Sequence, residues 1–392
     1  MEIGHANRQT RMSGISGHPL GRYPHPPVMR VAVVPMDRAC MANGHEFATL
    51  EALARRLARL HGYDYAGVHD LSTSGLPIYF VPEYTLLSVE AEALGITDAG
   101  DLFGGVVPRA FIATKVVSHP VLENVQAVPP GWSHTLFPHL SDAVLPGYSM
   151  FSEHDARRAG RRLLAGGPVR LKLARGSGGN GQVLVRNPDE LDDALAHLEE
   201  DELPRHGAVI ERHLHQATTC SVGTVECAGI RITYAGTQRT TCNRDGTDVY
   251  GGSDLVVARG GFDALRRVGL DDKLQHAIAQ AQRYHGAMRD AYPAFFASRC
   301  NYDVVQGLDR QGAWHSGVLE QSWRLGGATP AELVALEAFA QDPSLDVVRA
   351  SSHEVHGEHE PPSGAVVHYR DIDPHWGLMT KYSLLQRHGY PA

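Results

Sequence analysis

Cysteine is scarce in this sequence, and its pattern excludes two kinds of structure. The cysteines are odd in number and none of them stand in C-x-x-C spacing, so neither a disulfide framework nor a structural zinc site is expected. We expect reduced, mostly buried thiols in a cytoplasmic protein. The five residues are Cys40, Cys220, Cys227, Cys242 and Cys300.

Long apolar runs and an excess of positive charge are also lacking. No apolar run approaches the ~20 residues that cross a bilayer, and residues 1–28 contain no apolar segment of a secretory signal. The 36 basic and 44 acidic residues give a net charge of −8, whereas nucleic-acid and polybasic membrane binding need an excess of Lys and Arg. The sequence therefore predicts no nucleic-acid partner, no membrane partner and a cytoplasmic location.

The composition is that of a globular protein, and the first third of the chain reads as a small α/β unit. Hydrophobic residues make up 43% and charged residues 20% of 392 positions, so we expect a packed core and two or three domains. Residues 1–28 read as a flexible tail. The hydrophobic pattern then predicts a strand over 30–35, a helix over 46–60, a strand over 77–82 and a helix over 85–94, with the unit ending near residue 108.

The rest of the chain alternates between helices and β-rich segments. We expect helices over 151–164, 187–200, 271–290 and 331–341, with Ser152 capping the first, and mostly strands over 209–257. The stretch after Asp342 reads as irregular, with a loop at Pro361 and Pro362. Its histidine-rich segment, 353–359, reads as a solvated loop rather than a transition-metal site, because the histidine spacing is not a helical ligand pair.

A glycine-rich loop lies between two predicted strands at residues 169–186. Four glycines in seven residues let backbone N–H groups approach phosphate oxygens without obstruction by Cβ atoms. The loop is neither a Walker A motif nor a Rossmann fingerprint, because no Gly-Lys-Ser/Thr follows and a strand rather than a helix comes next. Two interpretations stay open: a flap over a nucleotide triphosphate, with Lys172 reaching the α- and β-phosphates, or a flexible surface hairpin.

Two carboxylates fall on a second predicted hairpin, over residues 301–325. Asp303 and Glu320 can face each other across the pair of strands, and like charges held that close favour a cation such as Mg²⁺ between them. Glu320, Ser322 and Arg324 alternate along one strand and so share a face. One face would then carry metal contacts and a fixed cation for a transferring phosphoryl group. The alternative is an exposed hairpin with ordinary surface charges.

Together these segments resemble the ATP-grasp superfamily. The resemblance rests on Lys172 with the glycine loop, on the hinge-like segment 209–214, and on Asp303, Glu320, Ser322 and Arg324, which are similar to the family's D…E-x-N-x-R pattern. It covers roughly residues 105–335 and implies an α/β (α+β) fold. The implied domains are a pre-ATP-grasp α/β domain over 29–108, one ATP-grasp subdomain over 109–205 with the glycine loop, a second over 206–341 with the metal site, and a C-terminal extension over 342–392.

The resemblance also implies roles for single residues. Phosphates would be bound by two lysines and the glycine loop, and the adenine pocket would be lined by the hinge, chiefly through its backbone. These cofactor-binding residues are Lys115, Lys172, Gly176, Ser177, Gly178, Gly179, Gly181, Glu211 and Leu214. Magnesium, or manganese in its place, would be held by Asp303, Glu320 and Ser322. Catalytic roles would fall to Arg324, which steadies the transferred phosphoryl group, and to Arg239. We place Arg239 and Tyr250 on the substrate side, and a purely structural role is the alternative for both.

Two positions depart from the family pattern. Ser322 stands where asparagine is usual, and a hydroxyl reaches less far toward a metal ion. No acidic residue follows Glu211 at the spacing usual for a ribose contact, because that region reads Thr218-Thr219-Cys220. These departures leave the ribose contact unassigned and keep a binding protein without catalytic activity among the alternatives.

The implied reaction is ATP-dependent ligation. A substrate carboxylate takes the γ-phosphoryl group of ATP, and an amine or a similar nucleophile then displaces phosphate from the acyl phosphate. Two alternatives remain: carboxylation of the biotin-carboxylase type through carboxyphosphate, and nucleotide binding without catalysis. The partners implied are a small carboxylate and a small amine, and a homodimer is one open oligomeric state. We expect Lys172→Ala and Glu320→Ala each to abolish ATP turnover and to leave the protein folded.

Overall fold

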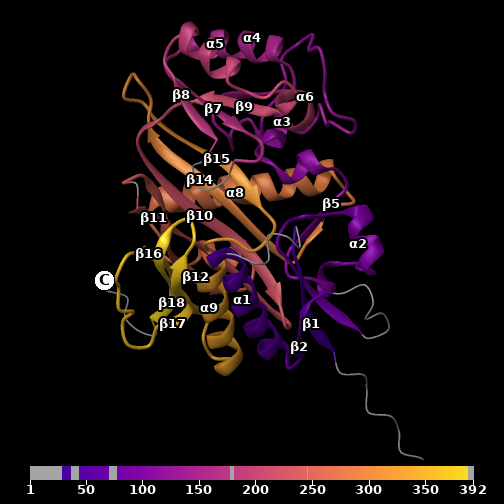
Figure 1. Cartoon of the computed structure of the whole chain (residues 1–392), viewed down its shortest axis with the longest axis vertical. Helices are drawn as coiled ribbons and strands as arrows, with labels where there is room; N and C mark the ends of the chain where they lie inside the picture. Colours follow the sequence, from indigo (N-terminus) through magenta and orange to yellow (C-terminus); the bar gives the residue numbers. More distant parts are fainter. Residues whose placement is uncertain (1–28, 37–43, 70–76, 177–180, 245, 387–392) are drawn as a thin grey trace, which may run out of the picture.

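The computed structural model describes residues 29–36, 44–69, 77–176, 181–244 and 246–386 (Figure 1). The predicted tail over 1–28 lies outside the described residues, as do Cys40 and four residues of the glycine loop, Ser177, Gly178, Gly179 and Asn180. The chain contains both helices and strands throughout, so the predicted α/β class is confirmed.

The N-terminal unit is a three-stranded parallel sheet of order β2-β1-β3 with one long helix. The strands expected over 30–35 and 77–82 and the helix expected over 46–60 are confirmed, and the structure adds one strand that was not predicted, β2. Their bounds are β1 (Arg30–Val34), α1 (His45–His61), β2 (Asp64–Val68) and β3 (Ile78–Pro82). The helix expected over 85–94 starts later, as α2 (Ser88–Leu94), because Leu86 and Leu87 form the short strand β4.

A small second sheet connects this unit to a distant part of the chain. Its order is β13-β5-β4, from β4 (Leu86–Leu87), β5 (Gly105–Val107) and β13 (Phe296–Ala297). Short helical turns lie on both sides of β5, the first before it and the other three between it and the rest of the fold. They are η3 (Ala99–Asp101), η4 (Ala110–Ala113), η5 (Lys115–Ser118) and α3 (Phe137–Leu140).

A four-stranded antiparallel sheet of order β6-β9-β7-β8 forms a lobe at the top of Figure 1. Its strands are β6 (Gly147–Met150), β7 (Val169–Leu173), β8 (Gln182–Val185) and β9 (Ala208–Arg212). Its helices are α4 (Glu153–Leu164), α5 (Pro188–Ala196) and α6 (Glu202–His206). The predicted cap of α4 is confirmed, since the Ser152 side chain accepts a hydrogen bond from the Asp155 N–H.

The largest sheet has eight antiparallel strands, in the order β15-β14-β10-β11-β12-β16-β18-β17. The strands of its first part are β10 (His215–Cys227), β11 (Ile230–Cys242), β12 (Asp248–Arg259), β14 (Arg299–Leu308) and β15 (Trp314–Ser322). The prediction of strands over 209–257 is therefore confirmed. Because successive side chains alternate between the faces of a strand, each face of this sheet carries its own core.

Helices cover both faces of the large sheet. Buried side chains such as Tyr302 belong to the core with α7 (Phe262–Arg266) and α8 (Asp272–Ala291). Side chains such as Tyr234 belong to the core with α1 and α9 (Thr329–Gln341). The predicted helices over 271–290 and 331–341 are thus confirmed. Among the described residues, none of the helices is long and apolar enough to cross a membrane.

The prediction that the chain is irregular after Asp342 is wrong. It forms three strands, β16 (Val347–His356), β17 (Val366–Asp373) and β18 (Gly377–Gln386), which complete the large sheet. The histidine-rich segment is also not simply a loop, because His353 and His356 lie within β16. This segment is extended because β16 hydrogen-bonds along the edge of β12. The paired residues lie about one hundred positions apart in the sequence.

Candidate functional site

The two predicted metal-binding carboxylates face each other. Asp303 on β14 and Glu320 on β15 are direct cross-strand partners, next to a bulge that shifts the register of the two strands. The side-chain amides of Gln238 and Asn301 both donate to Oδ1 of Asp303, at 2.8 Å each. These bonds hold one oxygen of the carboxylate and orient the other.

The electrostatics of this pair fit a divalent cation. Burial and the negative charge of Glu320 raise the pKa of Asp303 to about 6, against hydrogen bonds from Asn301 and Gln238 that lower it. A carboxylate whose ionisation is opposed by a like charge gains from a cation placed between the two groups. Carboxylate oxygens are the ligands that Mg²⁺ and Mn²⁺ prefer. The donor set therefore fits the cation expected from the sequence.

Ser322 is close to this pair but already has a partner. Strand β15 ends at Ser322, whose hydroxyl accepts a hydrogen bond from Nη1 of Arg299 at 3.3 Å. The same guanidinium donates to the carbonyls of Ser322 and Arg324. Because β15 ends at Ser322, Arg324 lies beyond the strand, and the prediction that the strand continues to Arg324 is wrong. Burial and the neighbouring Arg299 lower the pKa of Arg324, while Glu320 raises it.

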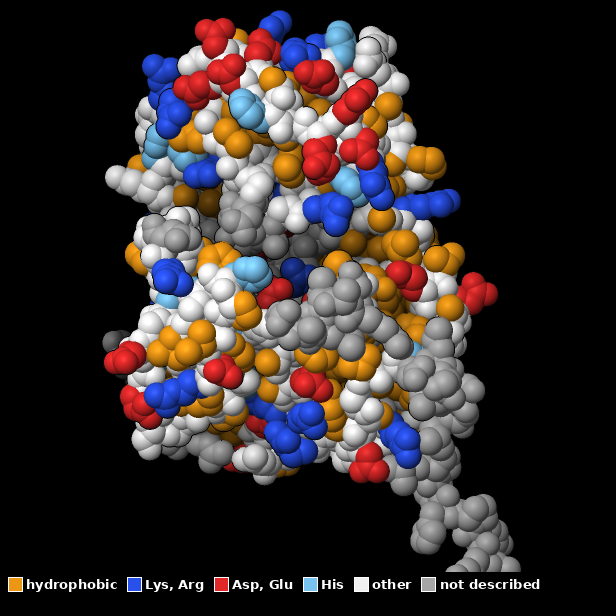
Figure 2. Space-filling model, in the orientation of Figure 1, with side chains coloured by type: hydrophobic (Ala, Val, Ile, Leu, Met, Phe, Trp, Pro, Cys, Tyr) orange, Lys and Arg blue, Asp and Glu red, His pale blue; other side chains and the backbone are white. Residues whose placement is uncertain are grey.

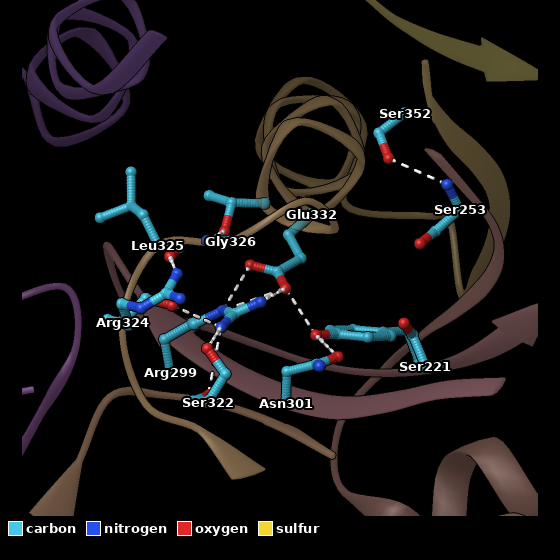
Figure 3. A network of polar contacts seen from close by, with 12 residues as sticks. Ser221, Ser253, Arg299, Asn301, Ser322, Arg324, Leu325, Gly326, Glu332 and Ser352 are labelled. Carbon is cyan, nitrogen blue, oxygen red and sulfur yellow. Dashed lines mark hydrogen bonds and ion pairs between the residues drawn. The ribbon is translucent and has the colours of Figure 1, made fainter. Parts of the chain in front are cut away.

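A buried ion pair that the sequence did not reveal supports this turn (Figure 3). Arg299 and Glu332 are 1% and 0% exposed, and Nη2 of Arg299 lies 2.7 Å from Oε1 of Glu332. The hydroxyl of Tyr234 donates to the same carboxylate oxygen at 2.5 Å. Glu332 thus fixes Arg299, and Arg299 in turn fixes the backbone at Ser322 and Arg324.

Lys115 reaches the carboxylate pair from a different part of the chain. Its side chain is buried, with Nζ 2.9 Å from Oε2 of Glu320. The same ammonium donates a hydrogen bond to the carbonyl oxygen of Gly176, in the turn after β7. The structure therefore joins three predicted site residues, one from each of three separate segments.

The strand that carries Glu320 also holds the backbone next to Lys115. The side-chain amide of Gln321 donates to the carbonyls of Ile112 and Thr114, at 2.8 Å each. The hydroxyl of Tyr284 donates to the amide oxygen of Gln321 at 3.0 Å. The backbone just before Lys115 is thereby hydrogen-bonded to β15, the strand that carries Glu320.

Lys172 and Glu211 form a second buried ion pair in the four-stranded sheet. Nζ of Lys172 lies 2.5 Å from Oε1 of Glu211, and Nε2 of His119 lies 3.2 Å from the other oxygen. All three side chains are buried. Burial raises the pKa of Glu211, but the charge of Lys172 and the contact with His119 outweigh it and lower the pKa to about 2.

This lowered pKa predicts a loss of stability in acid. Glu211 titrates near 4.5 when the chain is unfolded and near 2 when it is folded. The unfolded state therefore binds the proton first, so the contribution of Glu211 is complete above about pH 4.5 and is lost as the pH falls toward 2. We expect the free energy of unfolding to fall on the order of 3 kcal/mol across this window through Glu211. Denaturant unfolding of the wild type and of Glu211→Gln between pH 7 and pH 3 measures this fall. If the free energy of unfolding decreased equally steeply with falling pH in both proteins, the assignment would be contradicted.

Leu214 lies in a small apolar cluster beside the carboxylate pair. Leu145, Leu214 and Val305 are buried together, and Leu319, the residue before Glu320, packs against them. The cluster joins the end of the four-stranded lobe to strands β14 and β15. Of the glycine-loop residues, Gly176 and Gly181 are described, and Gly181 has φ +69°, a conformation that favours glycine.

Tyr250 lies on the same face of the large sheet as Asp303. Its hydroxyl contacts the hydroxyls of Ser253 at 2.7 Å and Ser352 at 3.3 Å, and its ring packs against Gly327 in the turn after Arg324. Tyr250 therefore buttresses the turn that carries Arg324.

This packing predicts opposite outcomes for two neighbouring glycines. A Cβ atom on Gly327 would lie 2.2 Å from the Tyr250 ring, whereas one on Gly326 would meet nothing closer than 3.7 Å. We expect Gly327→Ala to lower the free energy of unfolding by about 1–3 kcal/mol, the usual cost of overpacking. Gly326→Ala is the matched control and should unfold like the wild type in urea. Equal midpoints for the two variants would show that Tyr250 does not constrain the turn.

Arg239, which was predicted on the substrate side, does not lie on the face of the sheet that carries Asp303. It follows Gln238 on β11, and Gln238 contacts Asp303, so Arg239 points to the opposite side of the sheet. There Nε lies 2.8 Å from Asp254, and Nη2 donates to the carbonyl of Ser352. The parity of the strand register, which the sequence alone did not fix, decides this position.

The site lies where the four-stranded sheet meets the large eight-stranded sheet. Figure 2 shows this side of the molecule hollowed below the lobe of the four-stranded sheet, with basic and acidic side chains together inside the hollow. Lys115, with its contacts to Glu320 on one side and Gly176 on the other, bridges the two parts. Among the described residues, no three His, Cys, Asp or Glu side chains lie together as a group that could hold a metal ion.

Several solved structures resemble the chain. They include a phosphoribosylamine–glycine ligase from Thermotoga maritima (11% identity, 91% of each chain covered, TM-score 0.48). A D-alanyl-alanine synthetase A from Vibrio cholerae (10% identity, 81% of this chain and 98% of that one, TM-score 0.44) is also similar. So is a RimK domain protein, described as ATP-grasp, from Sphaerobacter thermophilus (15% identity, 79% and 96%, TM-score 0.37).

Comparisons of the sequence itself give one result. A search of curated proteins finds no match. A family model described as "Protein of unknown function (DUF3182)" matches residues 33–383, which include every described residue of the site. The chain therefore belongs to the DUF3182 family of proteins of unknown function.

Proposed function

We propose that the protein is an ATP- and Mg²⁺-dependent ligase that activates a substrate carboxylate as an acyl phosphate. The observation that carries the proposal is the position of Lys115. Its ammonium joins Glu320, one of two facing carboxylates, to the backbone of the glycine-rich turn at Gly176. A cation site, a lysine and a glycine turn at one place are what binding of a nucleotide triphosphate requires.

The nucleotide would lie between the two sheets. Leu214 and Leu319 provide apolar contacts for a purine ring next to the carboxylate pair. Lys115 would bind the phosphates, with the backbone of the glycine turn above them. Lys172 would contribute positive charge from the four-stranded sheet, although Glu211 neutralises much of that charge at 2.5 Å.

The cation would be held by Asp303 and Glu320, with the Ser322 hydroxyl available only if it exchanges Arg299 for the metal. Mg²⁺ or Mn²⁺ bound there would neutralise the phosphate charge and draw the substrate carboxylate and the γ-phosphate together. Gln238 and Asn301 keep Asp303 oriented for this contact through two hydrogen bonds to a single oxygen.

The chemistry then requires positioning rather than a covalent nucleophile on the protein. A carboxylate oxygen of the substrate attacks the γ-phosphorus, the bond to the β-phosphate oxygen breaks, and ADP leaves. An amine, or a similar nucleophile, attacks the acyl carbon, loses a proton and releases phosphate. Arg324, in the turn after β15 and fixed through its carbonyl by Arg299, would stabilise the charge on the transferred phosphoryl group.

A screen of paired acids and amines for phosphate release tests the proposal. Asp303→Asn and Glu320→Gln each remove one negative charge from the cation site and should lower ATP turnover about a thousandfold. Glu360→Gln, in an exposed ion pair with Arg370, is the matched control and should keep wild-type turnover.

Three results would contradict the proposal in different ways. Turnover near the wild-type rate in both Asp303→Asn and Glu320→Gln would remove the carboxylate pair from the mechanism. ATP binding without ADP formation across the whole screen would favour a nucleotide-binding protein that does not catalyse ligation. ADP release that depends on bicarbonate and biotin would indicate a carboxylase instead.

A further inference from the structure

The Lys115 side chain spans two parts of the molecule that are otherwise built separately. Its backbone is fixed to β15, because Gln321 holds the carbonyls of Ile112 and Thr114 just before it. Its ammonium also contacts Gly176, which belongs to the turn between β7 and β8 in the other sheet. The backbone beside Lys115 is therefore attached to the large sheet, and its ammonium group contacts the turn that follows β7 in the four-stranded sheet.

The ammonium group takes its two described partners from opposite sides of the site. Lys115 is 4% exposed, so little water reaches it, and its contacts are the Glu320 carboxylate and the Gly176 carbonyl. The Glu320 side chain is 34% exposed and can be reached from solvent. A positive charge of the protein itself thus lies where a cation would contact Glu320.

We propose that Lys115 is a latch that controls when the cation site becomes available. Without nucleotide, its ammonium neutralises Glu320 and ties the β7–β8 turn to the metal-binding strand. When a triphosphate enters, the ammonium moves from Glu320 to the phosphates, and Glu320 becomes free to bind the cation. This inference rests on the proposed function, since it assigns the order in which nucleotide and cation engage the same site.

The latch makes cation binding depend on the nucleotide. A divalent ion that arrives alone must displace the ammonium from Glu320 or share the carboxylate with it, and two cations close together repel. A cation that arrives with a triphosphate meets no such competition, because the phosphates attract Lys115. Free cation should therefore bind weakly, and removal of the Lys115 charge should strengthen that binding.

The experiment measures Mn²⁺ binding to the full chain without nucleotide, by electron paramagnetic resonance of the free ion. Lys115→Met keeps the length of the side chain and removes its charge, and Lys115→Gln is a second neutral variant. We expect both to bind Mn²⁺ about tenfold more tightly than the wild type. Arg283→Met removes one positive charge from an exposed pair with Asp142 and should leave Mn²⁺ binding unchanged.

Hydrogen exchange on the same proteins tests the other half of the latch. In the Lys115 variants, amides of β7 and β8 should exchange faster than in the wild type, while those of β10 and β11 should not change. The latch is overturned if both folded variants bind Mn²⁺ with the affinity of the wild type. It is also overturned if the wild type binds Mn²⁺ tightly without nucleotide. Failure of the wild type to bind ATP is a separate result, because it overturns the proposed function.

Discussion

Glu332→Ala is expected to lower the free energy of unfolding by about 3–5 kcal/mol and to abolish ATP turnover. Removing one partner of a buried ion pair leaves the other charge uncompensated in the protein interior. Arg299 is 1% exposed and would keep its contacts only with the Ser322 hydroxyl and the carbonyls of Ser322 and Arg324. The turn that carries Arg324 would then lose its support. Urea unfolding measures the first effect and phosphate release the second.

The same substitution in an exposed ion pair is the control. Glu360 pairs with Arg370 on the surface, with both side chains largely in solvent, and surface ion pairs add little stability. Glu360→Ala should therefore unfold at a urea concentration close to that of the wild type. If Glu332→Ala were as stable as Glu360→Ala, the buried pair would not be what holds the turn after β15.

Lys172→Met is expected to cost about 3–5 kcal/mol of stability at neutral pH, for a related reason. Glu211 is 1% exposed, and without Lys172 its described side-chain contacts would be reduced to the one with His119, which leaves a buried charge without its ion-pair partner. The structure therefore revises the expectation that Lys172→Ala leaves the protein folded and affects turnover alone. Thermal and urea unfolding of the variant at pH 7 measure the loss.

A double variant separates the ion pair from other effects of the lysine. Lys172→Met combined with Glu211→Gln leaves no buried charge in the pair, and the two neutral side chains should recover more than half of the lost stability. Glu211→Gln alone leaves Lys172 unpaired and should be destabilised as well. A double variant no more stable than the worse single one would show that Lys172 and Glu211 are not coupled.

The part of the site that lies within one hairpin was predictable from the sequence. Asp303 and Glu320 are joined by a short turn, so the alternation of side chains along two adjacent strands placed them opposite each other. The glycine-rich turn between β7 and β8 was visible for the same reason. In both cases local spacing decides the geometry, and no distant contact is needed.

Features that depend on distant contacts were not predictable. Arg299 and Glu332 lie on a strand and a helix, and each reads as an ordinary charge in its own segment. The available signal was Glu332 itself, a charge in the otherwise apolar first turns of α9. Arg239 was predicted on the substrate side, but its direction follows from the register of β11 beside β10, which pairs Gly236 with Ser221 and brings Gln238, two residues further on, into contact with Ser221 and Asp303.

The C-terminal strands escaped prediction because their pattern is not that of a half-buried strand. On β17, Val367 and Ile372 are exposed by 46% and 72%, while His368 is buried. On β18, Lys381 and Ser383 are buried beside apolar residues. Polar residues inside and apolar residues outside reverse the usual alternation. Here the pairing of β18 with β16, the pairing of β17 with β18 and the contacts of β17 with α1 outweigh it.

The position of β16 has a practical consequence for any attempt to trim this protein. A chain ending near Asp342 would correspond to the segment that resembles ATP-grasp enzymes, but it would leave β12 as an unpaired sheet edge twelve residues long. Open edges of that length invite pairing with other molecules and aggregation. A recombinant fragment cut there should come out insoluble, so the last fifty residues belong in every soluble preparation.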